Sequence, residues 1–187
     1  MRHTFAIYVE DKPGVLNRIA SLFRRRGFNI ESLTVGHTEM PTVSRMTIVV
    51  DTDTNGARRL EANLYKLVNI LRVHDITSDL AVFRELAMVK VSTETQETRT
   101  HVMQLVDVFR ARVVDVAPDS VIIEITGTEA KIEGLLKVLS PYGILELVRT
   151  GRVGMVRGPS SVMVDPSETN RAERSTTIDD ENVSFSV

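Results

Sequence analysis

The sequence contains no cysteine, and this absence removes several kinds of chemistry at once. Disulfide bonds, thiolate nucleophiles and cysteine-ligated metals are all excluded. The four histidines, His3, His37, His74 and His101, are far apart in the chain and lack the spacing of metal ligands. We therefore expect neither a metal site nor a reactive thiol in this chain.

Long apolar runs are also missing. No stretch approaches the length of a membrane span, and the N-terminal region lacks the apolar segment and small-residue cleavage site of a secretory signal. We therefore expect a cytoplasmic protein, although a processed organellar chain would show the same features.

A large charge of one sign is the third absence. The formal net charge is −2, so no global field attracts nucleic acid or an anionic membrane. The run Arg24-Arg25-Arg26 is basic, but no aromatic or second basic stripe accompanies it. We interpret these arginines as complementing the end of a helix dipole or contacting an acidic partner.

The most informative stretch runs from Val9 to Ser32 and predicts the end of a strand, a tight turn, a helix and the start of a second strand. Asp11 is a suitable N-cap for this helix, and Gly27 follows it as a stop. Four apolar residues have the spacing of one helix face: Leu16, Ile19, Ala20 and Phe23.

The start of this helix can receive an anion. The first-turn amides of Gly14, Val15 and Leu16 have no partner within the helix. Because Gly14 has no side chain, a ligand can approach the backbone closely there. A small carboxylate is the natural guest of such a helix start, although a cap and a glycine also begin many helices that bind nothing.

Periodicity along the rest of the chain predicts the order βαββαβ twice, which is an α+β chain of two ferredoxin-like domains. We place the first domain at residues 1–79 and the second at 85–158. The second lacks the D-x-P-G helix start, and the glycine-rich run near Gly151 is expected to be a mobile connector. Residues 159–187 are polar and without periodicity, so we expect a disordered tail.

The residues also carry a resemblance to a known family. D-K-P-G-V-L, followed by R-R-G-F-N-I-E-S-L, resembles the opening of an ACT domain, a small amino-acid-sensing module. The runs G-F-N-I-E-S-L-T-V, S-R-M-T-I-V-V and L-Y-K-L-V-N-I-L-R-V are similar to the regulatory small subunit of acetolactate synthase, also called acetohydroxyacid synthase. The resemblance covers roughly Met1 to Gly158.

The resemblance implies a regulatory subunit with no active site of its own. It implies a homodimer formed through the ACT domain, and a partner in the large catalytic subunit. Thiamine diphosphate, Mg and FAD would belong to that catalytic subunit, so no cofactor is expected in this chain. The subunit would raise the activity of its partner and confer feedback inhibition by valine or another branched-chain amino acid.

The resemblance also implies which residues bind the amino acid, at the interface of two copies. The ligand carboxylate would accept hydrogen bonds from the amides of Gly14, Val15 and Leu16. Asn29 of the neighbouring subunit would hold the polar end of the ligand. Leu16 and Ile30 would line the side-chain pocket, although core packing explains these two residues equally well.

Asp11 departs from the asparagine that the family often has at this position. Its carboxylate could pair with the ligand ammonium and strengthen binding, or repel the ligand carboxylate and weaken it. We therefore include Asp11 in the expected site with the sign of its effect open.

Two other functions are compatible with parts of the sequence. A stand-alone amino-acid-sensing regulator would share the ACT domain, but no helix-turn-helix accompanies the paired units. An enzyme would share the ferredoxin-like fold, but no carboxylates cluster with a histidine and no thiol is present.

Overall fold

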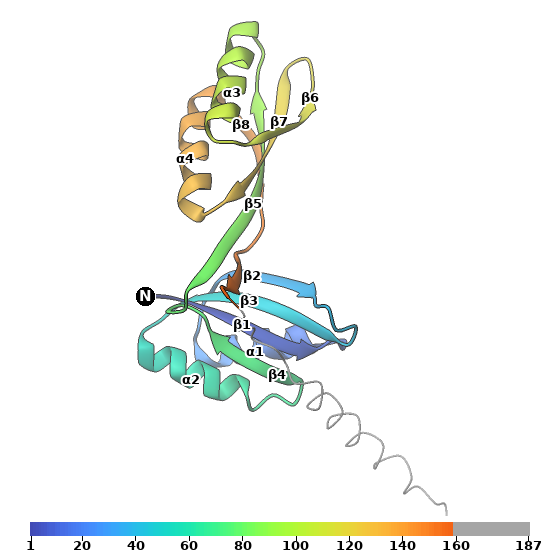
Figure 1. The fold of residues 1–187 in the computed structure, drawn as a ribbon, viewed down its shortest axis with the longest axis vertical. Coiled ribbons are helices and arrows are strands. Elements are labelled where there is room, and N and C mark those ends of the chain that lie inside the picture. Colours follow the sequence, from blue (N-terminus) through green and yellow to red (C-terminus); the bar gives the residue numbers. More distant parts are fainter. Residues whose placement is uncertain (159–187) are drawn as a thin grey trace, which may run out of the picture. The chain divides into compact units, whose positions relative to one another are not determined.

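The computed structural model describes residues 1–158 of the 187, and these form two units (Figure 1). The first unit comprises Met1–Glu31, Val35–Leu80 and the segment that begins at Val156; the second comprises Ser32–Thr34 and Ala81–Met155. Each unit has the element order βαββαβ, which confirms the predicted α+β fold of two ferredoxin-like units. The tail predicted at residues 159–187 lies outside the described residues.

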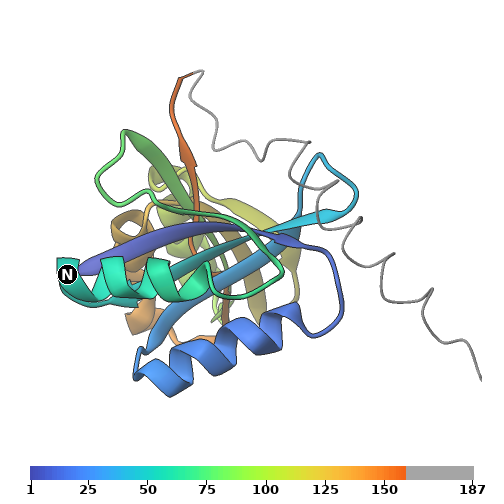
Figure 2. The same ribbon diagram turned by 90° about the horizontal axis from the view of Figure 1, so that it is seen from below.

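The first unit is an antiparallel sheet with both of its helices on one face (Figures 1 and 2). Its strands lie side by side in the order β2-β3-β1-β4, so that β1 and β3 are central. In this register Phe5 pairs with Ile48 and Ile7 pairs with Val73. The elements along the chain are β1 (Arg2–Glu10), α1 (Val15–Arg26), β2 (Ile30–His37), β3 (Val43–Asp51), α2 (Thr54–Leu64) and β4 (Ile70–Asp75).

The buried face of α1 differs from the predicted one. Ile19 and Phe23 are buried as expected, but Leu16 and Ala20 are exposed, whereas Val15 and Leu22 are buried. Two overlapping sets of apolar residues have helical spacing in this segment, and packing against the sheet selects the set that begins one residue earlier. Leu16 is therefore 42% exposed and free to contact another molecule.

The second unit repeats the strand order of the first. Its sheet has the order β6-β7-β5-β8, and α3 and α4 cover one face of it (Figure 1). The elements are β5 (Ala81–Ser92), α3 (Gln96–Val108), β6 (Arg112–Val116), β7 (Ser120–Gly127), α4 (Glu129–Leu139), the 3₁₀ turn η1 (Ser140–Tyr142), β8 (Ile144–Arg149) and β9 (Val153–Val156). The core beneath these helices is built from Ala87, Val89, Val91, Val102, Val106, Val121, Ile123, Ile125, Ile132, Leu135 and Leu139.

The prediction of a mobile connector around Gly151 is wrong for part of that segment. Residues Val153–Val156 form strand β9, which pairs with β5. Strand β5 begins at Ala81, but its pairing with β7 begins only at Glu85. The first residues of β5 are therefore not paired with β7, and an edge that is left open in this way pairs readily with a further strand such as β9.

Three of the four helices in residues 1–158 begin with a side-chain cap. Asp53 accepts a 2.6 Å hydrogen bond from the Gly56 amide at the start of α2. Thr95 and Thr128 cap α3 and α4 in the same way. Helix α1 has no such side-chain cap, and the amides of its first turn form part of the candidate site.

Candidate functional site

Helix α1 begins at a glycine in the left-handed region. Gly14 has φ +82° and is the N-cap of the helix, and its carbonyl accepts the Arg18 amide at 3.0 Å. A Cβ at position 14 would meet no atom within 4 Å, so the space beside this backbone is open. The glycine thus provides both the unusual φ and an uncovered approach to the helix start.

Asp11 is not the N-cap, contrary to expectation. Its backbone amide donates to the Thr42 carbonyl at 2.8 Å, and its carboxylate accepts the Ser44 hydroxyl at 3.2 Å. The other carboxylate oxygen lies 3.3 Å from Nδ1 of His37. Asp11 is therefore held by β3 and the end of β2. The helix begins three residues later, with Gly14 as its N-cap.

The amides of the first turn are only partly occupied. The Val15 amide lies 3.4 Å from the Lys12 carbonyl, which is a long hydrogen bond. No acceptor among the described residues pairs with the amides of Gly14 and Leu16. The first turn also has no acidic residue, so the partial positive charge of the helix end is not neutralised there.

A network behind this turn fixes its position, and sequence reasoning missed it. The buried Asn69, which precedes β4, donates to the Glu10 carboxylate at 2.6 Å and accepts from the Arg18 guanidinium at 2.6 Å. The Glu10 amide donates to the Asn69 carbonyl at 3.0 Å, and Lys12 lies 3.2 Å from the Glu10 carboxylate. These contacts link the strand before the turn to the helix after it, and nothing local in the sequence indicates a partner so distant.

The opposite end of α1 is closed by a Schellman motif. Gly27 has φ +73° and its amide donates to the Arg24 carbonyl at 3.2 Å, while the Phe28 amide donates to the Phe23 carbonyl at 3.0 Å. The rings of Phe23 and Phe28 meet edge to face, with centroids 6.4 Å apart, which is the apolar contact that accompanies this motif. The turn directs the chain into β2 and places Asn29 immediately before that strand.

The expected site residues therefore form two groups. Gly14, Val15 and Leu16 lie at the start of α1, with Asp11 in the preceding loop. Asn29 and Ile30 follow the end of the helix; Asn29 is exposed and has no hydrogen-bond partner among residues 1–158, and Ile30 is half-buried. The structure thus brings the amides together but does not bring Asn29 to them within one copy of the chain.

The histidine and acidic side chains elsewhere in the described residues form pairs rather than clusters. No three histidine, aspartate or glutamate side chains within residues 1–158 are grouped as metal ligands. Nδ1 of His3 lies 2.7 Å from a carboxylate oxygen of Asp75. Nε2 of His74 lies 2.6 Å from a carboxylate oxygen of Asp79. In this part of the chain no helix is long and apolar enough to cross a membrane.

Family models match most of the chain. Residues 5–72 match the model described as an AHAS small subunit-like ACT domain, and residues 84–158 match the model for the small subunit of acetolactate synthase.

Individual relatives agree with these models. The acetolactate synthase small subunit of Mycobacterium leprae is 49% identical over 160 residues, covering 86% of this chain and 94% of the relative. The probable acetolactate synthase small subunit of Archaeoglobus fulgidus is 51% identical over 158 residues, covering 84% and 98%. The crystal structure of the acetolactate synthase small subunit from Thermotoga maritima superposes with a TM-score of 0.78 at 38% identity, covering 84% of this chain and 98% of that one.

Proposed function

The chain belongs to the family of acetolactate synthase small subunits, and from that premise we propose that it regulates a catalytic subunit by binding a branched-chain amino acid. The partner would be the large, thiamine-diphosphate-dependent subunit, which joins two pyruvates into acetolactate. This chain would raise the partner's activity and contribute no catalytic residue or cofactor of its own. We further expect the complex to be cytoplasmic, which fractionation of the source cells would test.

The proposed ligand site lies where two copies of the first unit meet. The carboxylate of valine accepts hydrogen bonds from the amides at the start of α1, and Asn29 of the second copy holds the polar end of the ligand. Three facts support this assignment: the Gly14 and Leu16 amides have no partner among the described residues, the space beside Gly14 is open, and Asn29 is exposed and unpaired.

Two apolar residues complete the proposed pocket. Leu16 projects from the exposed side of α1 and Ile30 is half-buried at the start of β2. An isopropyl group placed against them would be removed from water, which favours a branched aliphatic side chain over a polar one. This is why we propose valine or a close homologue as the ligand.

Asp11 belongs to the proposed site as the residue that faces the ligand ammonium. Its carboxylate is held in place by the Ser44 hydroxyl and by His37, so it need not be ordered by the ligand. An ammonium close to such a carboxylate gains a charge-assisted hydrogen bond.

Feedback inhibition requires more than binding. Valine can shift the enzyme toward a less active arrangement only if it binds the two arrangements with different affinity, by roughly 1–3 kcal/mol for typical coupling. A site shared between two copies meets this need, because any change in how the copies pair changes the site itself.

The observation that carries the proposal is the pair of amides, at an open helix start formed by a glycine, that have no partner within residues 1–158. The test is reconstitution with the acetolactate synthase catalytic subunit of the same organism. We expect the chain to increase activity, valine to reduce it, and the Asn29→Ala and Gly14→Asp variants to keep the increase while losing the response to valine. A chain that neither binds nor activates that subunit would contradict the proposal and favour a stand-alone amino-acid sensor.

A further inference from the structure

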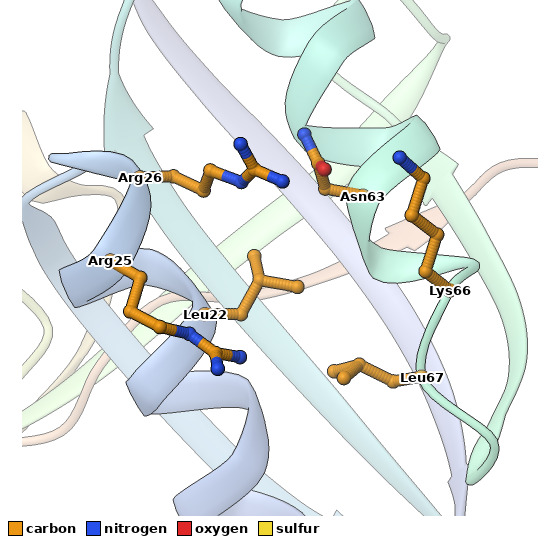
Figure 3. Close-up of a pocket in the computed structure, with 6 residues that line it drawn as sticks. All are labelled: Leu22, Arg25, Arg26, Asn63, Lys66 and Leu67. Carbon is orange, nitrogen blue, oxygen red and sulfur yellow. The ribbon is translucent and has the colours of Figure 1, made fainter.

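A basic groove lies between the two helices of the first unit, away from the start of α1. Its volume is about 490 Å³, and it is lined by Leu22, Arg25, Arg26, Asn63, Lys66 and Leu67. Figure 3 shows the two leucines pointing toward one another across the floor, with cationic side chains around them. The groove thus combines an apolar floor with a positively charged rim.

The three cations of the rim have no anionic partner in the described part of the chain. Arg25, Arg26 and Lys66 are exposed, and none forms an ion pair with any residue from 1 to 158. The dipole at the end of α1 accounts for part of the charge of Arg25 and Arg26. Lys66 lies just after the C-terminal end of α2, where the dipole of that helix also favours a cation. Three like charges around one groove nevertheless repel one another and favour an anionic occupant.

The chain itself carries a segment of matching chemistry. Residues 178–187 read I-D-D-E-N-V-S-F-S-V, in which three consecutive acids lie between apolar residues. We propose that this C-terminal segment docks in the groove of its own chain, with Asp179, Asp180 and Glu181 against the cationic rim. Apolar contacts on the leucine floor are needed as well, because exposed ion pairs alone contribute little.

The connection is long enough for this contact. The Arg157 amide donates to the Leu80 carbonyl at 2.8 Å, which fixes the chain to the first unit just before the tail begins. Residues 159–177 then separate this anchor from the acidic segment, and an extended chain of that length spans up to about 60 Å. A domain of this size has a radius of gyration of only about 12 Å, so every point of its surface is within reach.

The proposed contact is independent of amino-acid binding. The family models end at residues 72 and 158, so the acidic segment lies outside both of them. None of the groove residues belongs to the proposed valine site. The tail would therefore be an added device of this chain, covering the helical face of the first unit.

The absence of cysteine allows a direct test by spin labelling. Ser184→Cys introduces a single labelling site near the end of the full chain, and the methyl resonances of Leu22 and Leu67 report on the groove. We expect the label to broaden these two resonances and to leave those of Leu135, in the core of the second unit, unchanged. High salt should weaken the broadening, because exposed charges are screened.

Charge reversal identifies the contact. The tail variant Asp179→Lys/Asp180→Lys/Glu181→Lys and the groove variant Arg25→Glu/Arg26→Glu/Lys66→Glu should each abolish the broadening, and their combination should restore it. Arg24→Glu is the matched control, since Arg24 does not line the groove, and it should have no effect. Because the tail variant leaves the folded unit untouched, the test holds even if the groove variant fails to fold.

Three outcomes would overturn the proposal. The Leu22 and Leu67 methyls could be unaffected by the label, which would show that the segment does not dock. Broadening could occur only between a labelled copy and an isotope-enriched copy, which would assign the groove to the tail of another chain. The groove resonances could shift only when the catalytic subunit is added, which would assign the groove to an acidic surface of that protein.

Discussion

Gly14 and Asn29 lie beyond opposite ends of the same helix, α1 (Val15–Arg26). Twelve helical residues rise by about 18 Å, far more than a free amino acid can bridge. In a two-fold symmetric dimer, every contact occurs twice. If Gly14 of the first copy lies beside Asn29 of the second copy, then Gly14 of the second copy lies beside Asn29 of the first. Two antiparallel copies of α1 would therefore form two identical sites, each with one Gly14 and one Asn29.

Loss of the Asn29 side chain should weaken valine binding without affecting the fold. Asn29 is exposed, and its side chain forms no hydrogen bond with any residue from 1 to 158. Removing a hydrogen bond to a charged ligand costs about 1.5–3 kcal/mol, so Asn29→Ala should raise the Kd roughly 10- to 100-fold. Calorimetric titration with valine measures this change. The matched control is Asn55→Ala on α2, also exposed, and equal losses in both variants would remove Asn29 from the site.

An acidic side chain at position 14 should abolish binding. Gly14→Asp places a carboxylate beside the amides that would receive the ligand carboxylate, and the open space there accommodates it. The positive φ makes any such variant less stable, by roughly 1–2 kcal/mol. Gly143→Asp, at φ +88° in the second unit, also places an aspartate at a positive φ but away from the proposed site, and it serves as the control for binding. Thermal unfolding should show a loss of stability for both variants, whereas only Gly14→Asp should fail to bind valine.

Two aspartates near helix starts should differ in their effect on stability. Asp53 caps α2, so Asp53→Ala should lower the free energy of unfolding by about 1 kcal/mol. Asp11 does not cap α1, and its contacts with Ser44 and His37 are partly exposed, so Asp11→Ala should cost less. Urea unfolding compares the two variants, with an unchanged m-value showing that both unfold as the parent does. A larger loss for Asp11→Ala would mean that this residue does stabilise the helix start.

An ionic cluster in the second unit should be important for its stability. Burial lowers the pKa of Arg149, but its hydrogen bonds to Glu133 and Glu85 outweigh this effect and the pKa is raised. The Glu85 side chain is only 9% exposed and contacts both Arg149, at 2.6 Å, and Arg152, at 3.5 Å. Glu85→Ala would leave two partly buried guanidinium groups with fewer partners, at a cost of about 2–4 kcal/mol.

Glu85→Gln is the control for this cluster, because it removes the charge but keeps a hydrogen-bond acceptor. The urea concentration at the midpoint of unfolding should be lower for Glu85→Gln than for the parent, and lower still for Glu85→Ala. If both variants were as stable as the parent, the cluster would be only a surface feature.

Much of the fold could be predicted because local pattern and packing agree. Alternation in β1 and helical spacing in α2 and α4 put the same residues in the core that the structure buries, for example Phe5, Leu60 and Leu135. Where two patterns overlapped, as in α1, only packing against the sheet could choose between Leu16 and Val15.

The errors have identifiable physical causes. The N-cap was assigned to Asp11 because aspartate is a strong cap, but the backbone at Gly14 starts the helix three residues later. Strand β9 was missed because glycine lowers strand propensity, whereas the free edge of β5 supplies a partner. The anchoring role of Asn69 depends on contacts with Glu10 and Arg18, which are 59 and 51 residues away in the chain, and no local pattern reveals it.

The candidate site was predictable only in part. The glycine at the helix start is a local feature, and so are first-turn amides without a partner in the described part of the chain; the structure contains both. The pairing of Gly14 with Asn29 of another copy depends on how two chains associate, which local sequence patterns do not determine. The pairing of Gly14 with Asn29 across two copies stays a prediction.

Mixing the two binding-deficient variants tests it most directly. In a dimer of one Gly14→Asp chain and one Asn29→Ala chain, one site carries both defects and the other carries none. After subunit exchange, we predict that the mixture of these two variants contains about a quarter of the parent's number of valine-binding sites with the parent's affinity in a calorimetric titration, as random pairing across a two-fold interface requires. No recovery of binding in a mixture shown to contain the mixed dimer would contradict a site shared between two copies.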